Sequence, residues 1–316
     1  MKKLSTRFIC LTIVSLFFLI SSGCYAMGPE KQHPYKRKPL DFSIGMVEGT
    51  TPWNLRPIPG VPNPVFTNLN VTGMMTRFVA DPFMVREKGR WYMFFEAVDQ
   101  LDGKGKIGLA ESNDGLRWKY RQVVLTETCH LSYPYVFKWQ DQYYMIPETF
   151  SKKAIRLYRA VDFPTKWEYV QDLIEGPYAD SSIVRFNGRW WIITADPRGN
   201  RRMYVFFARD LTGPWYDHPL NPIYLNNQHF ARPGGRIICD AGKLYRFAQD
   251  DYKVYGNKLW AFQITELSTT GYAEKLTPNN PILKASGKGW NALGMHQLDI
   301  YRVSKNRWLG CVDGRK

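Results

Sequence analysis

Long hydrophobic segments are scarce in this sequence, and helical patterns are scarcer still. Beyond residue 20 no run is apolar enough to cross a membrane. No long stretch repeats apolar residues at a spacing of 3.6, while glycine and proline recur every few residues. These absences argue against a membrane-spanning helix and a helical bundle. They leave an all-β fold as the expected class.

Motifs for metals, disulfides and bound cofactors are also missing. Once the first 26 residues are set aside, Cys129, Cys239 and Cys311 remain, an odd number at wide spacing. None of the five histidines forms a His-x-x-x-His pair. No glycine-rich phosphate loop, serine nucleophile elbow or Cys/His dyad is present. We therefore expect no disulfide framework and no cofactor.

The amino-terminal segment has the pattern of an export signal. Lys2, Lys3 and Arg7 precede an uncharged apolar run over residues 8–20, and small residues lead to Ala26. Ser22, Gly23 and Cys24 also resemble the end of a lipobox, although Ser21 stands where a branched apolar residue is usual. We expect an extracytoplasmic protein, periplasmic or secreted, with a lipoprotein anchored through Cys24 as the alternative. The expected boundaries are a signal peptide over 1–26, a linker over 27–41 and one domain over 42–316.

The charge balance is strongly basic. The formal charge is +15, and removal of Lys2, Lys3 and Arg7 lowers it to +12. An acidic partner is compatible with this charge. However, lysines and arginines are spread along the chain, and no nucleic-acid-binding motif appears, so we do not expect nucleic acid as a partner. A carbohydrate or glycolipid fits better.

Five segments share one layout, an apolar strand, a polar turn of about three residues and a second strand opened by aromatic or apolar residues. This is the pattern of a β-hairpin, and it recurs about every 50 residues. The five copies are Asp81–Val85 with Gly89–Glu96, Tyr133–Phe137 with Asp141–Glu148, Asp180–Val184 with Gly188–Asp196, Gly234–Ile238 with Gly242–Asp250, and Leu298–Arg302 with Asn306–Asp313.

A second pair of strands, with a tryptophan or tyrosine at its bend, follows each of the first four hairpins. The fifth copy is displaced to the amino end, over residues 44–66. Pairing this amino-terminal half with the last hairpin would complete a four-stranded sheet and leave no open edge. The sequence thus predicts a five-bladed β-propeller closed by an amino-terminal half-blade. A β-sandwich is the alternative that strands of this length also permit.

In a propeller the hairpin starts and ends meet at one rim of the central channel. The predicted rim carries three candidates for acid and base chemistry, Asp81, Glu148 and Asp180, because they stand in aromatic, weakly charged surroundings. Glu96, Asp196 and Asp313 at the other hairpin ends can equally be structural caps. The expected substrate-binding residues are His130, Tyr133, Tyr178, Arg232, Arg236, Asp250 and His296.

Several of these segments carry a family resemblance. Residues 80–83, 130–137, 144–148, 157–160, 234–236, 244–246 and 249–256 resemble the amino-terminal domain of plant glucosamine inositolphosphorylceramide transferases and its bacterial stand-alone relatives. More distantly, that domain is similar to the five-bladed propellers of arabinanases, levansucrases and invertases, the glycoside hydrolase family 43/32-like superfamily. The first resemblance covers residues 42–314. The plant proteins carry their transferase chemistry in a separate domain, so transferase activity is not expected of this chain.

The distant resemblance implies a glycan substrate and a catalytic trio of two aspartates and a glutamate. Asp81 aligns with the base or nucleophile of that superfamily. Asp180 aligns with the aspartate that adjusts the pKa of the acid. Arg232–Arg236 stands where the acid is expected, so Glu148 or Asp250 would serve instead. His296 resembles a channel histidine that supports a calcium or sodium ion. Our leading hypothesis is a glycosidase-like enzyme, with a glycan or glycolipid head-group binding module and an envelope scaffold as alternatives.

Overall fold

The computed structural model describes residues 41–196 and 201–316. The predicted signal peptide, Cys24 and linker residues 27–40 lie outside these residues, and the described chain enters its first strand at Phe42. In the described part no helix is long and apolar enough to cross a membrane. The helical elements there are three short 3₁₀ turns, η1 (Asn68–Asn70), η2 (Phe150–Lys152) and η3 (Gly289–Asn291).

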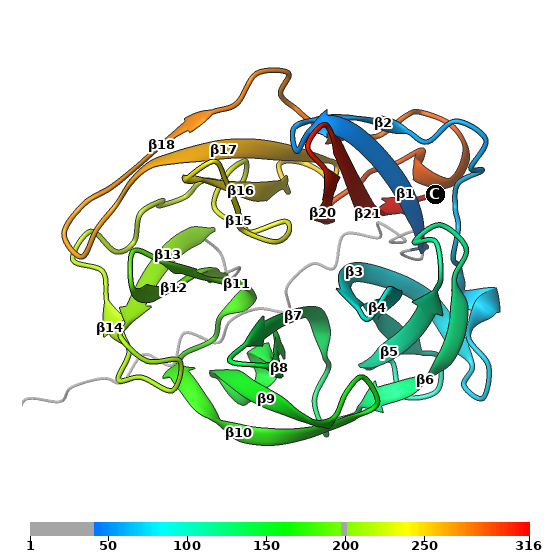
Figure 1. Ribbon diagram of the computed structural model, residues 1–316, viewed down its shortest axis with the longest axis horizontal. Coiled ribbons are helices and arrows are strands. Elements are labelled where there is room, and N and C mark those ends of the chain that lie inside the picture. The colour runs from blue at the N-terminus through cyan, green and yellow to red at the C-terminus, as the bar shows by residue number, and fades with distance from the viewer. Residues whose placement is uncertain (1–40, 197–200) are drawn as a thin grey trace, which may run out of the picture. The chain divides into compact units, whose positions relative to one another are not determined.

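Five antiparallel sheets are arranged around a central axis as the blades of a propeller (Figure 1). The first blade contains β3 (Thr76–Glu87), β4 (Arg90–Asp99), β5 (Gly105–Ser112) and β6 (Lys119–Leu125). The second contains β7 (Ser132–Trp139), β8 (Gln142–Glu148), β9 (Ala154–Asp162) and β10 (Lys166–Glu175). The third contains β11 (Ala179–Phe186), β12 (Arg189–Asp196), β13 (Arg202–Ala208) and β14 (Tyr216–Asp217). The fourth contains β15 (Ile238–Asp240), β16 (Lys243–Asp250), β17 (Lys258–Leu267), β18 (Tyr272–Leu276) and β19 (Leu283–Lys284). The all-β, five-bladed fold predicted from the repeats is confirmed.

The fifth blade combines strands from both ends of the described chain. Its order is β2 (Asn54–Pro57), β1 (Phe42–Thr51), β21 (Arg307–Arg315) and β20 (Leu298–Ser304). β1 and β21 pair antiparallel from Phe42 opposite Arg315 to Gly49 opposite Trp308. Consequently the rim end of β21, which carries Asp313, lies beside the first described strand.

The hairpins turn more tightly than the sequence suggested. β3 and β4 are joined by two residues, Lys88 and Gly89, and both have positive φ. Asn187 and Gly188 join β11 and β12 in the same way. A two-residue turn with positive φ at both positions matches the twist of the flanking strands, and glycine adopts it without strain.

The core consists of aromatic and aliphatic layers between adjacent blades. Phe83 of the first blade meets the ring of Tyr133 edge-on at 4.8 Å, and Phe94 meets Trp167 of the second blade at 5.5 Å. Such contacts bury large apolar area and fix each blade against its neighbour. The inner strands are therefore held on a rigid frame around the channel.

Candidate functional site

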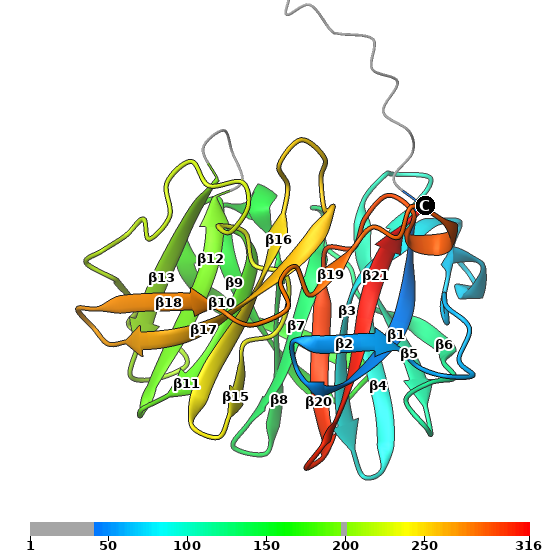
Figure 2. The same cartoon turned by 90° about the horizontal axis from the view of Figure 1, so that it is seen from above.

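The inner strands of four blades begin at the same end of the ring. β3, β7, β11 and β20 start there, and β4, β8, β12, β16 and β21 end there (Figure 2). We call this end the site rim. It gathers Asp81, Glu148 and Asp180 from three blades, as the repeat alignment predicted.

Three inner strands share an unusual backbone at the site rim. Asp81, Tyr133 and Asp180 have φ of 50°, 45° and 53°, a left-handed conformation that non-glycine residues rarely adopt. The strand pairing slips at each of these positions, so each residue belongs to a bulge. Bulges re-aim side chains, and strain of this kind concentrates at functional sites.

Asp180 accepts hydrogen bonds from two side chains at the rim. Its Oδ2 accepts hydrogen bonds from Nε of Arg232 at 2.5 Å and from Nε2 of Gln249 at 2.6 Å. Arg232 also approaches Glu148 at 3.8 Å and Asp251 at 3.7 Å. One buried guanidinium therefore faces three carboxyl groups, and its charge compensates only part of theirs.

Glu148 is a carboxyl group whose ionisation this arrangement opposes. Burial and the adjacent charge of Asp180 raise the pKa of Glu148 well above its usual value, although Arg232 opposes the shift. Asp180 contributes further by accepting a hydrogen bond from the protonated acid. Oε2 of Glu148 is buried, lies 3.8 Å from the guanidinium of Arg232, and has no hydrogen-bond partner within the protein. A neutral acid with an unpaired oxygen is suited to donating a proton.

Asp81 lies across the rim in a second acidic cluster. Its Oδ2 accepts the backbone N–H of Tyr133 at 3.2 Å, and its Oδ1 lies 3.8 Å from Nε2 of His296. Burial raises the pKa of Asp81 well above its usual value, with the nearby carboxylates adding to the shift and His296 opposing it. A carboxylate whose pKa moves toward neutrality becomes a stronger base.

His296 is a buried imidazolium fixed by Asp313. Its Nδ1 lies 2.7 Å from Oδ1 of Asp313, and its ring stacks on Phe42 at 4.5 Å. Burial lowers the pKa of His296, but the carboxylates of Asp313, Asp81 and Asp180 outweigh burial and raise it to about 9. His296 thus provides Asp81 with a positive neighbour at neutral pH.

Asp81, His296 and Asp313 are also close enough to suggest a metal site, since one ligand atom from each lies within 4.8 Å of the others. The donor chemistry does not fit an ion. Oδ1 of Asp313 accepts two backbone N–H groups besides the imidazole, and its Oδ2 accepts the N–H of Asp81. The triad is better described as a charge-balanced hydrogen-bond network than as the ion site that the resemblance implied.

His130 forms a smaller pair at the edge of the rim. Gly105 donates its backbone N–H to Nδ1 of His130 at 2.9 Å, so the proton of the neutral ring lies on Nε2. That nitrogen lies 3.0 Å from Oε1 of Glu96. The ring is partly exposed, which leaves His130 available to a ligand from the solvent side.

Four other predicted residues lie elsewhere or are already engaged. Tyr133 is fully buried, and its hydroxyl donates to the carbonyl of Gly235 at 3.0 Å, so its ring presents no open face to a sugar. Tyr178 packs on Tyr204 and Phe206 in the third blade. Arg236 lies deeper in the channel, and Asp250 is fully buried.

Asp250 cannot serve as the missing acid. His229, Trp260 and Tyr252 donate to its two oxygens. Burial opposes ionisation, but these hydrogen bonds outweigh it and lower the pKa of Asp250. The predicted alternative to Glu148 is therefore a structural anion.

Sequence reasoning missed three residues that contact the rim. Gln249 and Asp251 flank Asp250, and both reach Arg232 or its partner Asp180, whereas Asp250 faces the blade. Successive side chains on a strand alternate between faces, and this alternation was the signal that could have found them. Tyr255 lies under the guanidinium of Arg232, with its ring centre 5.3 Å away.

Solved structures similar to this chain are five-bladed propellers of carbohydrate-active enzymes. A putative glycosidase from Bacteroides thetaiotaomicron matches with a TM-score of 0.60 and 13% identity, over 81% of this chain and 95% of that one. A β-1,2-mannobiose phosphorylase from Listeria innocua matches with a TM-score of 0.61 and 14% identity, over 80% and 95%. Identities this low support the fold alone. The fold is glycoside-hydrolase-like.

Sequence relatives are considerably closer. Glucosamine inositolphosphorylceramide transferase 1 of Oryza sativa subsp. japonica is 36% identical over 297 residues, and its Arabidopsis thaliana counterpart is 35% identical over 297. Each alignment covers 86% of this chain, but the chain spans only about 40% of the length of these relatives. The family described as "Glucosamine inositolphosphorylceramide transferase 1, N-terminal" matches residues 30–315. The resemblance seen in the sequence is confirmed, and the chain belongs to this family.

Proposed function

We propose that the chain is an exported carbohydrate-active propeller that cleaves a glycosidic bond by acid and base catalysis. In this proposal Glu148 donates the proton, Asp81 acts as base or nucleophile, and Asp180 tunes the donor. The observation that carries the proposal is the setting of Glu148, a buried carboxyl group beside Asp180 whose pKa is raised and whose Oε2 has no hydrogen-bond partner within the protein. Export is supported by the amino-terminal pattern of cations and apolar residues.

The proposed reaction assigns one task to each carboxyl group. Glu148 gives its proton to the glycosidic oxygen as the bond from that oxygen to the anomeric carbon breaks. Asp81 accepts a proton from the attacking water, or attacks the anomeric carbon itself. Asp180, hydrogen-bonded by Arg232 and Gln249, raises the pKa of Glu148, so that Glu148 retains its proton until the leaving oxygen takes it.

Unpaired acceptors near the rim also favour a polyhydroxylated ligand. Oε1 of Gln249 is buried without a hydrogen-bond partner within the protein, as is Oε2 of Glu148. Buried acceptors without donors are costly, and sugar hydroxyl groups are donors of the right kind. This supports a sugar at the rim.

One observation favours a second candidate, a glycan or glycolipid head-group binding module. Arg232 occupies the middle of the rim, and its guanidinium contacts Asp180 and approaches Glu148 and Asp251. A cation at this place can hold a ligand through hydrogen bonds without breaking any bond. In this candidate the same rim would present the ligand to a separate enzyme.

The test is release of sugar from paired substrates that differ in their leaving group. Nitrophenyl glycosides need little help from an acid, whereas alkyl glycosides depend on it. We expect Glu148→Gln to lower turnover of alkyl glycosides by about 10²–10⁴-fold, the usual contribution of a general acid or base, and to affect nitrophenyl glycosides much less. Asp81→Asn should impair both classes.

Glu127→Gln is the matched control, because Glu127 lies near the same rim but bonds to Tyr158 and Arg156 instead of facing the site. It should leave turnover unchanged. Sugar release that survives in both Asp81→Asn and Glu148→Gln would refute the catalytic assignments. Saturable glycan binding with no release by the wild-type protein would establish the binding module instead.

A further inference from the structure

Among the described residues, the three most exposed large apolar side chains lie on segments at the site rim of the first blade, where Asn68 donates its side-chain amide to the carbonyl of Thr76 at 3.2 Å. Leu69 is 87% exposed, Leu101 is 79% exposed and Met75 is 58% exposed. Leu101 follows the end of β4, and Met75 precedes the start of β3. Gln100 donates its N–H to the carbonyl of Met75 at 2.7 Å, so these two loops are joined. Apolar exposure of this degree on adjacent loops marks an interaction surface.

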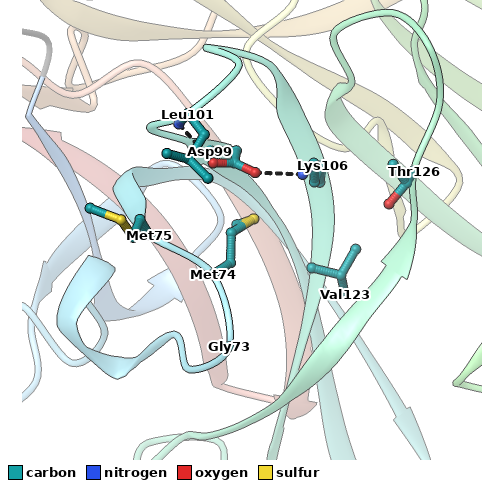
Figure 3. Close-up of a pocket in the computed structure, with 8 residues that line it drawn as sticks. All are labelled: Gly73, Met74, Met75, Asp99, Leu101, Lys106, Val123 and Thr126. Atoms are coloured by element: carbon teal, nitrogen blue, oxygen red, sulfur yellow. Dashed lines mark hydrogen bonds and ion pairs between the residues drawn. The ribbon is translucent and has the colours of Figure 1, made fainter.

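A cavity of about 600 Å³ opens between these loops (Figure 3). Met74, Met75, Leu101 and Val123 supply its apolar walls. Its polar wall is the ion pair between Nζ of Lys106 and Asp99, at 2.5 Å. Flexible methionine side chains adapt to irregular apolar ligands. The surface therefore combines protruding apolar tips with a cleft that can receive an alkyl group.

Positive charge surrounds the apolar tips. On residues 68–78, 99–106, 126–130 and 149–153, cations outnumber carboxylates; they are Arg77, Lys104, Lys106, Lys152 and Lys153 against Asp99, Asp102 and Glu127. Protruding apolar residues ringed by lysine and arginine are the composition of surfaces that sit in an anionic lipid interface.

The fourth blade repeats this composition on the same rim. Tyr252 and Val254 are exposed in the loop between β16 and β17, and the exposed Lys253 stands between them. Tyrosine is favoured at the level of lipid head groups because one end of its ring is polar. Contacts on two blades would fix the orientation of the rim parallel to a surface, whereas contacts on one blade would leave that orientation free.

We propose that the site rim docks on an anionic lipid bilayer, with Leu69, Met75 and Leu101 entering the interface and the surrounding cations over the head groups. Docking in this orientation turns Glu148 and Asp81 toward the membrane surface. The proposal goes beyond the proposed function, because docking does not depend on cleavage of any bond.

Hydrogen–deuterium exchange of the full chain with lipid vesicles tests the proposal. Exchange is read peptide by peptide, so binding through any other part of the chain does not imitate the expected pattern. With vesicles containing phosphatidylglycerol, we expect protection of residues 68–76 and 99–105. Protection of residues 251–256 should follow at later times. Residues 161–169 and 209–217, near the opposite end of the ring, should exchange as before. Vesicles of phosphatidylcholine alone should give much weaker protection.

Serine variants distinguish binding through the rim from nonspecific adsorption to the vesicles. Leu69→Ser with Leu101→Ser should raise the lipid concentration for half-maximal protection by about tenfold or more, which corresponds to about 1.4 kcal/mol. Val161→Ser with Tyr216→Ser is the matched control, because these side chains are 56% and 55% exposed at the opposite end. The control should change nothing. Absence of rim protection with anionic vesicles, or equal effects of the two double variants, would overturn the proposal.

Discussion

Two arginines four residues apart, Arg232 and Arg236, have opposite surroundings. Arg232 stands at the rim among Asp180, Glu148 and Asp251. Asp251 also pairs with Arg201 at 2.7 Å, so three carboxyl groups share two guanidinium groups. Arg236 lies deeper, and its guanidinium is matched by its partners. It pairs with Asp299 at 2.6 Å and donates to the carbonyl of Val136 at 2.8 Å.

The difference follows from what lies between the arginines. Gly235 has φ of 150°, and an added Cβ would lie 1.9 Å from the carbonyl oxygen of Leu298. Only glycine allows the chain to press against β20 there, and this contact sends Arg236 into the channel. Arg236 then ties three blades together, whereas Arg232 is left to govern protonation. An ion pair whose charges balance stabilises the fold. A cluster with more carboxyl groups than cations can take up and release a proton.

The largest expected effect that tests this contrast comes from Arg236→Ala. Removing one member of a buried ion pair leaves Asp299 charged and unpaired, which costs about 3–5 kcal/mol of unfolding free energy. Urea unfolding at pH 7 measures the loss. Arg232→Ala should cost no more than about 2 kcal/mol, because Asp180 keeps its bond from Gln249 and the nearby acids can retain a proton. Equal losses in the two variants would break the distinction.

The repeat pattern predicted the blades because strand alternation and turn residues are local properties of the sequence. It also placed Asp81, Glu148 and Asp180 at one rim, since equivalent positions of a propeller share a rim. It did not predict side-chain direction. Asp250 was chosen over Asp251 although only Asp251 reaches Arg232, and a shift of one residue along a strand reverses the face.

Tyr133 shows a second limit of the sequence. Its alignment with Asp81 and Asp180 is correct, and all three share the left-handed bulge. Yet its side chain turns inward to bond Ser182 and Gly235, at 2.9 and 3.0 Å. Partners brought together from distant blades decide that direction, and no local pattern records them.

The pH dependence of stability tests a second charged group of the rim, His296. The folded state raises the pKa of His296 to about 9, above the value of about 6.5 in an unfolded chain. The imidazolium therefore stabilises the fold fully below pH 6.5, and this contribution is lost as pH rises through 9. The size is roughly 3 kcal/mol. Urea unfolding between pH 6 and pH 10 should show this decline in the wild-type protein.

His296→Asn removes the titrating ring while its amide can still donate to Asp313. The variant should lose less stability than the wild-type protein over the same pH interval, whatever its stability at pH 6. A decline of equal size in both proteins would show that His296 is not the group responsible. The assignment of a positive charge to His296 at neutral pH would then be wrong.

The smallest expected effect is a gain in stability, opposite in sign to the losses expected above. The folded state raises the pKa of Glu148, so ionising this group disfavours folding, and stability falls as pH rises above the unfolded value of about 4.5. Glu148→Gln removes that penalty and should stabilise the protein at pH 8 by about 1–2 kcal/mol, with little gain at pH 4. Asp299→Asn beside Arg236 is the contrasting variant. Burial raises the pKa of Asp299 as well, although Arg236 opposes the shift. The variant should nevertheless destabilise, because the buried guanidinium loses its anion. A gain at Glu148 with a loss at Asp299 would mean that the rim holds strained acid for chemistry while the interior holds a balanced pair for stability. Destabilisation by both variants would place Glu148 among the structural carboxylates and remove the basis for its role as proton donor.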